Sequence, residues 1–371
     1  MNRAIAALSV LIILTTLSAG AQQFGSSACD YEPPESRVVD LGLQGAFNWY
    51  DGAFTDDRNR TISASLLSEF TSLFSSASSG WTLDGRAEVR LEGNAWSGNL
   101  AGSGSLSSFF DDDLFGVGAL GFDASSDAGF ELDLTGGVGK GRFRDVTPLA
   151  QANEIQNTLL DLGELLAPIA DTTLLDLARI LGEVGPTDED KVVRLAERLV
   201  ATDLIPGNDL GVRGLLAIES VLSSLDETRL CGYDVQARLG ASAMFIPEFS
   251  LAATGILEAR YAVVPTPVSR FRASAEAKFR LAHPDQLSVV ADVSYSHRLP
   301  DGWTGRVDYR LGFDRLWSAA DVISMSHAIF ATLNVQIFGS TGLSLVGSGQ
   351  YKTGDEEITL ALSVFLEAEL F

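Results

Sequence analysis

Most of the chain alternates apolar and polar residues with a period of two, and this feature constrains the fold more than any other. In the segment 81–95 the odd positions are mainly apolar and the even positions are polar or charged. The segment 270–281 repeats the pattern, with Phe, Ala and Leu at odd positions and Arg, Ser, Glu and Lys at even ones. Such segments run for about ten to fourteen residues, the length of a tilted strand that crosses a bilayer.

Turn-forming residues separate these segments and divide them into strands before residue 146 and strands after residue 230. The total is about 14, an even number, as closed single-chain bacterial barrels normally have. A soluble antiparallel sheet also alternates, but it would need a far larger core than these loops can cover. Aromatic residues near strand ends, such as Trp81, Tyr233 and Tyr261, are typical of the girdle at a membrane interface. We therefore expect an all-β transmembrane antiparallel β-barrel with a helical insert between strands 6 and 7.

The insert, residues 146–230, repeats its leucines at helical spacing. Its first stripe runs from Leu159 to Leu166, and Pro186 with the acidic turn after it predicts the start of a helix. Further helices are expected over about 172–183 and 214–227. We interpret the leucine stripes as the core of a small bundle rather than as a partner-binding face. Because the insert follows an even number of strands, it is expected on the periplasmic side.

The N-terminus has the three parts of a secretory signal peptide. Arg3 is followed by an apolar stretch, and Ala19-Gly20-Ala21 predicts cleavage after Ala21. The predicted division is a signal peptide at 1–21, an N-terminal periplasmic segment at 22–36, strands 1–6 at 37–145, the helical module at 146–230 and strands 7–14 at 231–371.

The two cysteines stand just before strands 1 and 7. Cys29 and Cys231 are therefore both expected at the periplasmic rim, where an oxidising compartment permits a disulfide. The two strands lie far apart around a barrel wall, so the N-terminal segment would have to bridge them. The sequence leaves open whether they are bonded.

Composition excludes several classes of function. Asp and Glu number 49 against 26 Lys and Arg, a net charge of −23, which disfavours a nucleic-acid partner. With few histidines and no CxxC pair, no metal or cofactor is expected. His283, His297 and His327 have no neighbouring nucleophile arrangement, so we expect no enzyme.

The polar face of the predicted strands divides by charge into two walls of a lumen, which predicts a transverse field across it. Pairing between neighbouring strands is the competing interpretation. The basic wall comprises Arg238, Arg260, Arg270, Arg272, Lys278, Arg280, Arg298, Arg306 and Arg310. The acidic wall comprises Asp40, Glu69, Asp84, Glu88, Glu92, Glu131 and Asp133.

The junction 139–148 is glycine-rich and basic before Thr147 and Pro148. We interpret it as a turn that leaves the wall and starts a helix. A phosphate-cradling nest is the alternative, although the spacing of a nucleotide loop is missing. Lys140, Arg142 and Arg144 at the rim would also suit lipid phosphates.

The signal peptide, the even strand number and the terminal Phe371 together resemble Gram-negative outer-membrane β-barrel proteins of the porin-like class. The resemblance implies a cell outer-membrane location, contact with outer-membrane lipid, and a passive channel or porin-like transporter for small polar solutes. The alternative is a structural outer-membrane protein whose helical module plugs the barrel or docks a periplasmic partner. An outer-membrane enzyme is a minor alternative.

Overall fold

The computed structural model covers most of the predicted strands and helices. It describes residues 29, 31, 36–51, 60–76, 78–92, 95–111, 113–126, 129–183, 185–224, 228–245, 249–281, 285–299, 303–317, 322–338, 341–352 and 359–368. The predicted signal peptide, nearly all of the segment 22–36 and the terminal Phe371 lie outside these residues. For the strands nearest the two chain ends only the backbone is described.

The described part of the chain is mostly one antiparallel sheet in which each strand pairs with the next along the chain, from β1 to β14. No pairing between β14 and β1 is described. The strands are β1 (Ser36–Asp51), β2 (Arg60–Ser75), β3 (Ser79–Glu92), β4 (Ala95–Phe109), β5 (Leu114–Ser125), β6 (Gly129–Asp145), β7 (Leu230–Met244), β8 (Ser250–Val263), β9 (Ser269–Leu281), β10 (Asp285–Arg298), β11 (Thr304–Trp317), β12 (Val322–Phe338), β13 (Thr341–Lys352) and β14 (Thr359–Ala368).

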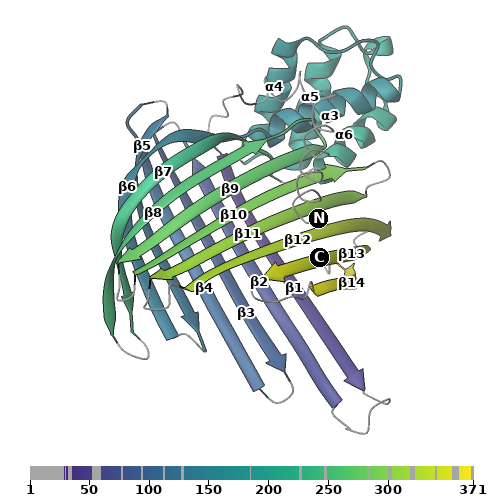
Figure 1. Cartoon of the computed structure of the whole chain (residues 1–371). Helices are drawn as coiled ribbons and strands as arrows, with labels where there is room; N and C mark the ends of the chain where they lie inside the picture. Colours follow the sequence, from purple (N-terminus) through teal and green to yellow (C-terminus); the bar gives the residue numbers. More distant parts are fainter. Residues whose placement is uncertain are drawn as a thin grey trace, which may run out of the picture.

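The sheet curves strongly, so that strands β8 to β12 cross in front of β1 to β5 (Figure 1). An ion pair identifies the concave face: Lys278 Nζ of β9 lies 2.7 Å from Asp133 Oδ2 of β6, although β7 and β8 lie between these strands in the sheet. Side chains of β6 and β9 meet only across the inside of the curve. Residues that share a face with Asp133 and Lys278 therefore point inward, and their sequence neighbours point outward.

Glycines permit the tight packing of β6 against β7. On the inward face of β6, a Cβ at Gly137 would overlap the carbonyl oxygen of Ala237, and one at Gly141 would overlap that of Tyr233. Gly141 also has a φ of +113°, which favours glycine. The prediction of a turn at this junction is wrong, because β6 continues through it to Asp145.

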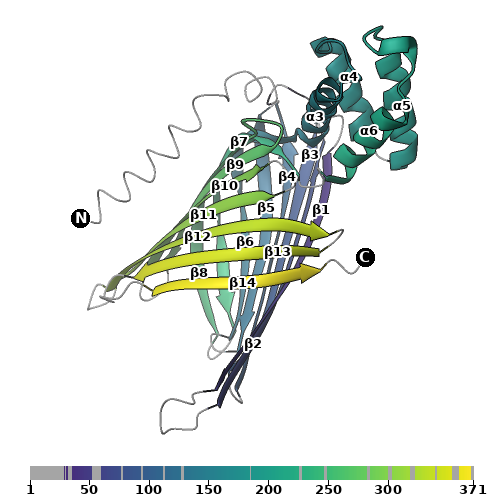
Figure 2. The same ribbon diagram turned by 90° about the vertical axis from the view of Figure 1, so that its right-hand side faces the viewer.

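The interruption folds into helices that gather at one end of the sheet, which Figure 2 shows from the side. Their bounds are α3 (Thr147–Asp161), α4 (Asp171–Gly182), α5 (Asp188–Val200), the 3₁₀ turn η1 (Pro206–Asn208) and α6 (Val212–Ser224). The junction prediction that Thr147 and Pro148 start a helix is confirmed. Thr187 and Asp190 form a capping box at α5. None of the helices in the described part of the chain is both long and apolar enough to cross a membrane.

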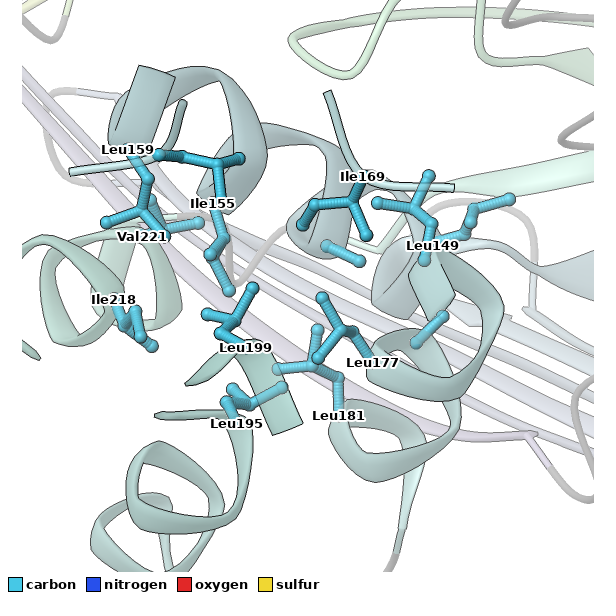
Figure 3. Close-up of a cluster of buried hydrophobic side chains, with 14 of the residues drawn as sticks. Leu149, Ile155, Leu159, Ile169, Leu177, Leu181, Leu195, Leu199, Ile218 and Val221 are labelled. Carbon is cyan, nitrogen blue, oxygen red and sulfur yellow. The ribbon is translucent and has the colours of Figure 1, made fainter. Parts of the chain in front are cut away.

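Leucine and isoleucine side chains form the core of the module (Figure 3). Ile155, Leu159, Leu177, Leu195 and Leu199 are fully buried, as expected for an internal stripe. The first stripe does not continue as a helix to its predicted end. Helix α3 ends at Asp161 because the chain turns through a glycine of positive φ two residues later, and this leaves Leu166 exposed.

The β6–β7 contact predicts opposite outcomes for two adjacent glycines. Gly137→Ala places a methyl group against the backbone of β7, which cannot yield, so we expect a loss of about 2 kcal/mol or more in stability. Gly136→Ala points the same methyl group outward, 3.7 Å from the carbonyl oxygen of Val117, and should be tolerated. The folded fraction in detergent, measured by heat-dependent gel mobility, tests both. Equal yields would contradict the close packing.

Candidate functional site

The charged residues of both predicted walls share the concave face of the sheet. Strand register places Asp234 opposite Arg260 and Asp292 opposite Arg310, so each pair points to the same side. The same alternation connects every described wall residue to the inward row of Asp133 and Lys278. Asp40, Glu69 and Glu92 occupy inward backbone positions, but their side chains lie outside the described ones.

Glu131, Asp133, Lys278 and Arg280 form a cross-sheet charge cluster between β6 and β9. Lys278 Nζ lies 3.4 Å from Glu131 Oε1 as well as 2.7 Å from Asp133 Oδ2, and Arg280 pairs with Glu131. The Ser242 hydroxyl of β7 donates a hydrogen bond to Asp133. The two predicted walls therefore touch at these residues instead of facing each other across open space. Because these four residues pair at hydrogen-bond distance, they contribute little to a field across the interior.

Most of the remaining described charges pair with a near neighbour, either on the adjacent strand, as in the competing interpretation of the sequence pattern, or two positions away on the same strand. Arg238 Nη2 lies 2.7 Å from Glu258 Oε2, and Arg310 Nε lies 2.7 Å from Asp292 Oδ1. Antiparallel register places such partners side by side, so pairing follows directly from the alternation. Further hydrogen-bonded ion pairs are Arg260–Asp234, Arg306–Asp308, Arg86–Glu88 and Arg90–Glu88. The remaining basic-wall residues have polar contacts as well. Arg270 donates to the hydroxyl of Ser296, and Arg272 donates to the carbonyl of Thr228. The backbone N–H of Arg298 donates to the carbonyl of Val268.

Two cavities open on the concave face, and their charges differ. The first, of about 780 Å³, lies at the end away from the helices. Its charged lining is Asp84, Asp123, Glu131 and Asp133 against Arg86, Lys278 and Arg280. The second, of about 660 Å³, lies at the end near the helices. Its charged lining is Arg86, Arg260, Arg272, Arg306 and Arg310 against Asp292 and Asp308. The charge bias of the interior thus changes along the strands, from acidic at one end to basic at the other.

The convex face carries exposed apolar side chains over both halves of the sheet. Leu134, Leu239 and Leu251 keep 63%, 76% and 68% of their surface exposed. Aromatic side chains stand at both ends of this face: Tyr233 and Tyr261 pair across β7 and β8 near the helices, and Phe245 and Phe249 contact each other at the opposite end. A continuous exposed apolar surface of this kind is unusual for a soluble monomer.

The N-terminal segment joins the sheet to the helical module. Cys29 and Cys231 form a disulfide, and Arg144 donates a hydrogen bond of 3.0 Å to the carbonyl of Cys29. Two residues later, Tyr31 is 4% exposed and its hydroxyl donates to the carbonyl of Ala178 in α4. The sequence placed the cysteines at one rim, but it contained no signal for the role of Tyr31.

The two histidines that the structure describes lie beside aromatic side chains. His327 Nδ1 lies 2.8 Å from the hydroxyl of Tyr309, and His297 stacks on Tyr295, both on the convex face by register. His283 lies outside the described residues. Where side chains are described, no three His, Cys, Asp or Glu residues gather as metal ligands would. Sequence reasoning also missed Ser242 and Thr254, because alternation marks them as inward without saying which groups they meet.

The buried Tyr31 predicts an alkaline transition of the module. Burial, reinforced by the negative charge of Asp145, raises the pKa of Tyr31 to about 12. The buried, neutral Tyr31 hydroxyl stabilises the folded module fully below about pH 10, where an exposed tyrosine starts to ionise. This stabilisation is lost as the pH rises toward about 12. Tyr31→Phe should remove up to about 2 kcal/mol of this alkaline loss. Thermal melting of the helices, followed by circular dichroism between neutral and alkaline pH, measures it.

The matched control is Tyr233→Phe, which changes an exposed tyrosine on the convex face. This variant should lose as much stability at alkaline pH as the unmodified chain does. Identical pH profiles for the unmodified chain and Tyr31→Phe would show that Tyr31 does not anchor the module.

Comparisons with known proteins assign this chain to no relative: no protein-family model matches it, and no curated protein matches it.

Proposed function

We propose that the chain is an outer-membrane β-barrel that acts as a passive channel for small polar solutes. The observation that carries the proposal is the division of the sheet into a charged concave face with cavities and an apolar convex face. In a water-soluble sheet the apolar face would be the covered one. The reverse arrangement suits a wet lumen surrounded by lipid.

Closure of the sheet belongs to this proposal. We place β14 beside β1, which would remove both open edges and give a closed barrel of about 14 strands. Edge strands with unpaired backbone groups would not be stable in hydrocarbon. The aromatic side chains at both ends of the convex face support a location at two membrane interfaces. The expected signal peptide accounts for export to the outer membrane.

A route for solutes is supported by the two interior cavities. Arg86 contributes to the lining of both, so they lie next to each other along the interior. Their charged linings favour water and polar solutes over apolar ones. The cross-sheet charge cluster lines the first cavity and connects its two sides, so it would be the narrowest point of the route.

A structural role is the second candidate, and the helical module favours it. The module lies at the end of the sheet nearest the second cavity and contacts Tyr31 of the N-terminal segment, which the Cys29–Cys231 disulfide joins to β7. Leu166, Val193 and Val212 are exposed on it. In this role the module would close the barrel or dock a periplasmic partner.

Single-channel conductance in planar bilayers separates the two candidates. Protein recovered from the outer-membrane fraction should conduct ions if the channel is open. Conductance only after deletion of residues 147–228 would assign the module as a plug. No conductance from either form would leave the structural role, and recovery of the chain in the soluble periplasm would reject the barrel.

The cross-sheet charge cluster gives a sharper prediction for the conducting form. In the Lys278→Gln, Arg280→Gln double variant, Glu131 and Asp133 lose the two cations that bind them across the interior. We expect higher conductance and a shift of ion selectivity toward cations, measured as the reversal potential in a salt gradient.

The control removes two arginines that also form ion pairs with carboxylates, but on the surface of the helical module. Arg194→Gln with Arg198→Gln breaks ion pairs to Glu183 and Asp176 and should leave conductance unchanged. A cluster variant with unaltered conductance and selectivity would show that these residues do not line the solute route.

A further inference from the structure

We propose that the basic cavity at the helical end of the concave face binds small organic anions in which a carboxylate or phosphate stands beside an apolar group. The inference rests on the proposed channel, since it names the solute class, but the cavity has its own binding chemistry. Three features of the lining support it: a group of arginines, guanidinium donors on two of them that face the cavity, and an apolar wall.

Arginines outnumber aspartates among the residues that line this cavity, whereas acidic residues outnumber basic ones in the whole chain. Five arginines line it with two aspartates, although the whole chain has a net charge of −23. Guanidinium groups bind carboxylate and phosphate oxygens through paired N–H donors, which an ammonium group cannot arrange in one plane. Arg260 and Arg86 pair with carboxylates beside the lining, so the donors offered to an anionic occupant are chiefly those of Arg306 and Arg310.

Arg306 and Arg310 present donors to the cavity even while they pair with aspartates. Arg306 uses only Nε for Asp308, at 2.9 Å and 2.8 Å from the two carboxylate oxygens, so this pair leaves the outer edge of the guanidinium unused. Arg310 binds Asp292 mainly through Nε, at 2.7 Å. The two arginine side chains keep 48% and 59% of their surface exposed. Both guanidinium groups are therefore accessible from the cavity.

Apolar side chains share the lining and point to the same side. Phe330 stands opposite Asp308 in the register of β11 and β12, and Phe143 stands opposite Gly232 on the inward row of β6 and β7. The guanidinium of Arg260 lies over the ring of Phe143 at 5.6 Å. An inorganic anion would leave this wall facing water, whereas an organic anion covers it. The volume of about 660 Å³ falls within the range of about 300–1,000 Å³ typical of small-molecule sites.

The first cavity serves as an internal contrast. Its four carboxylates outnumber its three cations, and Lys278 and Arg280 are bound to Glu131 and Asp133. The same anion should therefore find no second site there.

Equilibrium binding to the full-length, disulfide-bonded protein in detergent tests the site without requiring conductance. The probes are benzoate and benzamidine, which have the same ring and opposite charges. Isothermal titration calorimetry should detect benzoate, with benzamidine at least about tenfold weaker. Arg306→Gln with Arg310→Gln should weaken benzoate binding by about tenfold or more, since it removes charged hydrogen bonds.

Two further variants keep the test decisive. Arg194→Gln with Arg198→Gln also removes two arginines that pair with carboxylates, but on the module surface, and should leave binding unchanged. Asp292→Asn with Asp308→Asn removes the groups that compete for Arg306 and Arg310, so benzoate should bind more tightly. An effect of opposite sign cannot come from misfolding.

Equal binding of benzoate and benzamidine, or a cavity variant that binds like the control, would overturn the site. Benzoate binding by a protein that conducts neither in its full-length form nor after deletion of residues 147–228 would reject the channel and support the site. Conductance without benzoate binding would support the channel and reject the site.

Discussion

Backbone pairing between consecutive antiparallel strands is the constraint on which the rest of this structure depends. Each strand from β1 to β14 pairs with its neighbours in chain order, and this register decides which side chains share a face. A shift of one residue in any pair would exchange the charged and apolar faces of that strand. The separation of a charged interior from an apolar exterior is thus a property of register, and the cavities exist because the register is maintained across the curve.

Strands β6 and β7 pack closely at one place in the curved sheet. On β6, glycines alternate on the inward face where β7 approaches, and no side chain would fit between the two backbones at Gly137 and Gly141. The sheet curves far enough for Lys278 of β9 to reach Asp133 of β6. The interior is consequently held by ion pairs across the sheet, in addition to those between neighbouring strands.

The helical module has a core of its own but is not held by that core alone. Its buried leucines and isoleucines come from all four α-helices, and Tyr31 from the N-terminal segment belongs to the same cluster. The disulfide to Cys231 lies at the point where the chain re-enters the sheet. A disulfide that closes so long a loop limits the freedom of the unfolded chain, and it holds the N-terminal segment with Tyr31 beside the module.

The sequence by itself determined the antiparallel β class, the position of the helical interruption and the face on which each charged residue lies, because a period of two or of 3.6 is a local property. It also indicated the start of α5, since the capping box is formed by residues three apart. Only the tertiary structure decided that β6 continues through the glycine-rich junction, that Glu131 meets Arg280, and that Tyr31 enters the module core. The first depends on pairing with β7, and the other two depend on contacts between residues 149 and 147 positions apart in the chain. The sequence pattern also predicted an electric field across the interior. In the structure the curvature brings some of those charges together as ion pairs, and the charged lining differs between the two cavities along the strands. Periodicity specifies the side to which a residue points, but its partner is set by the packing of strands that are distant in the chain.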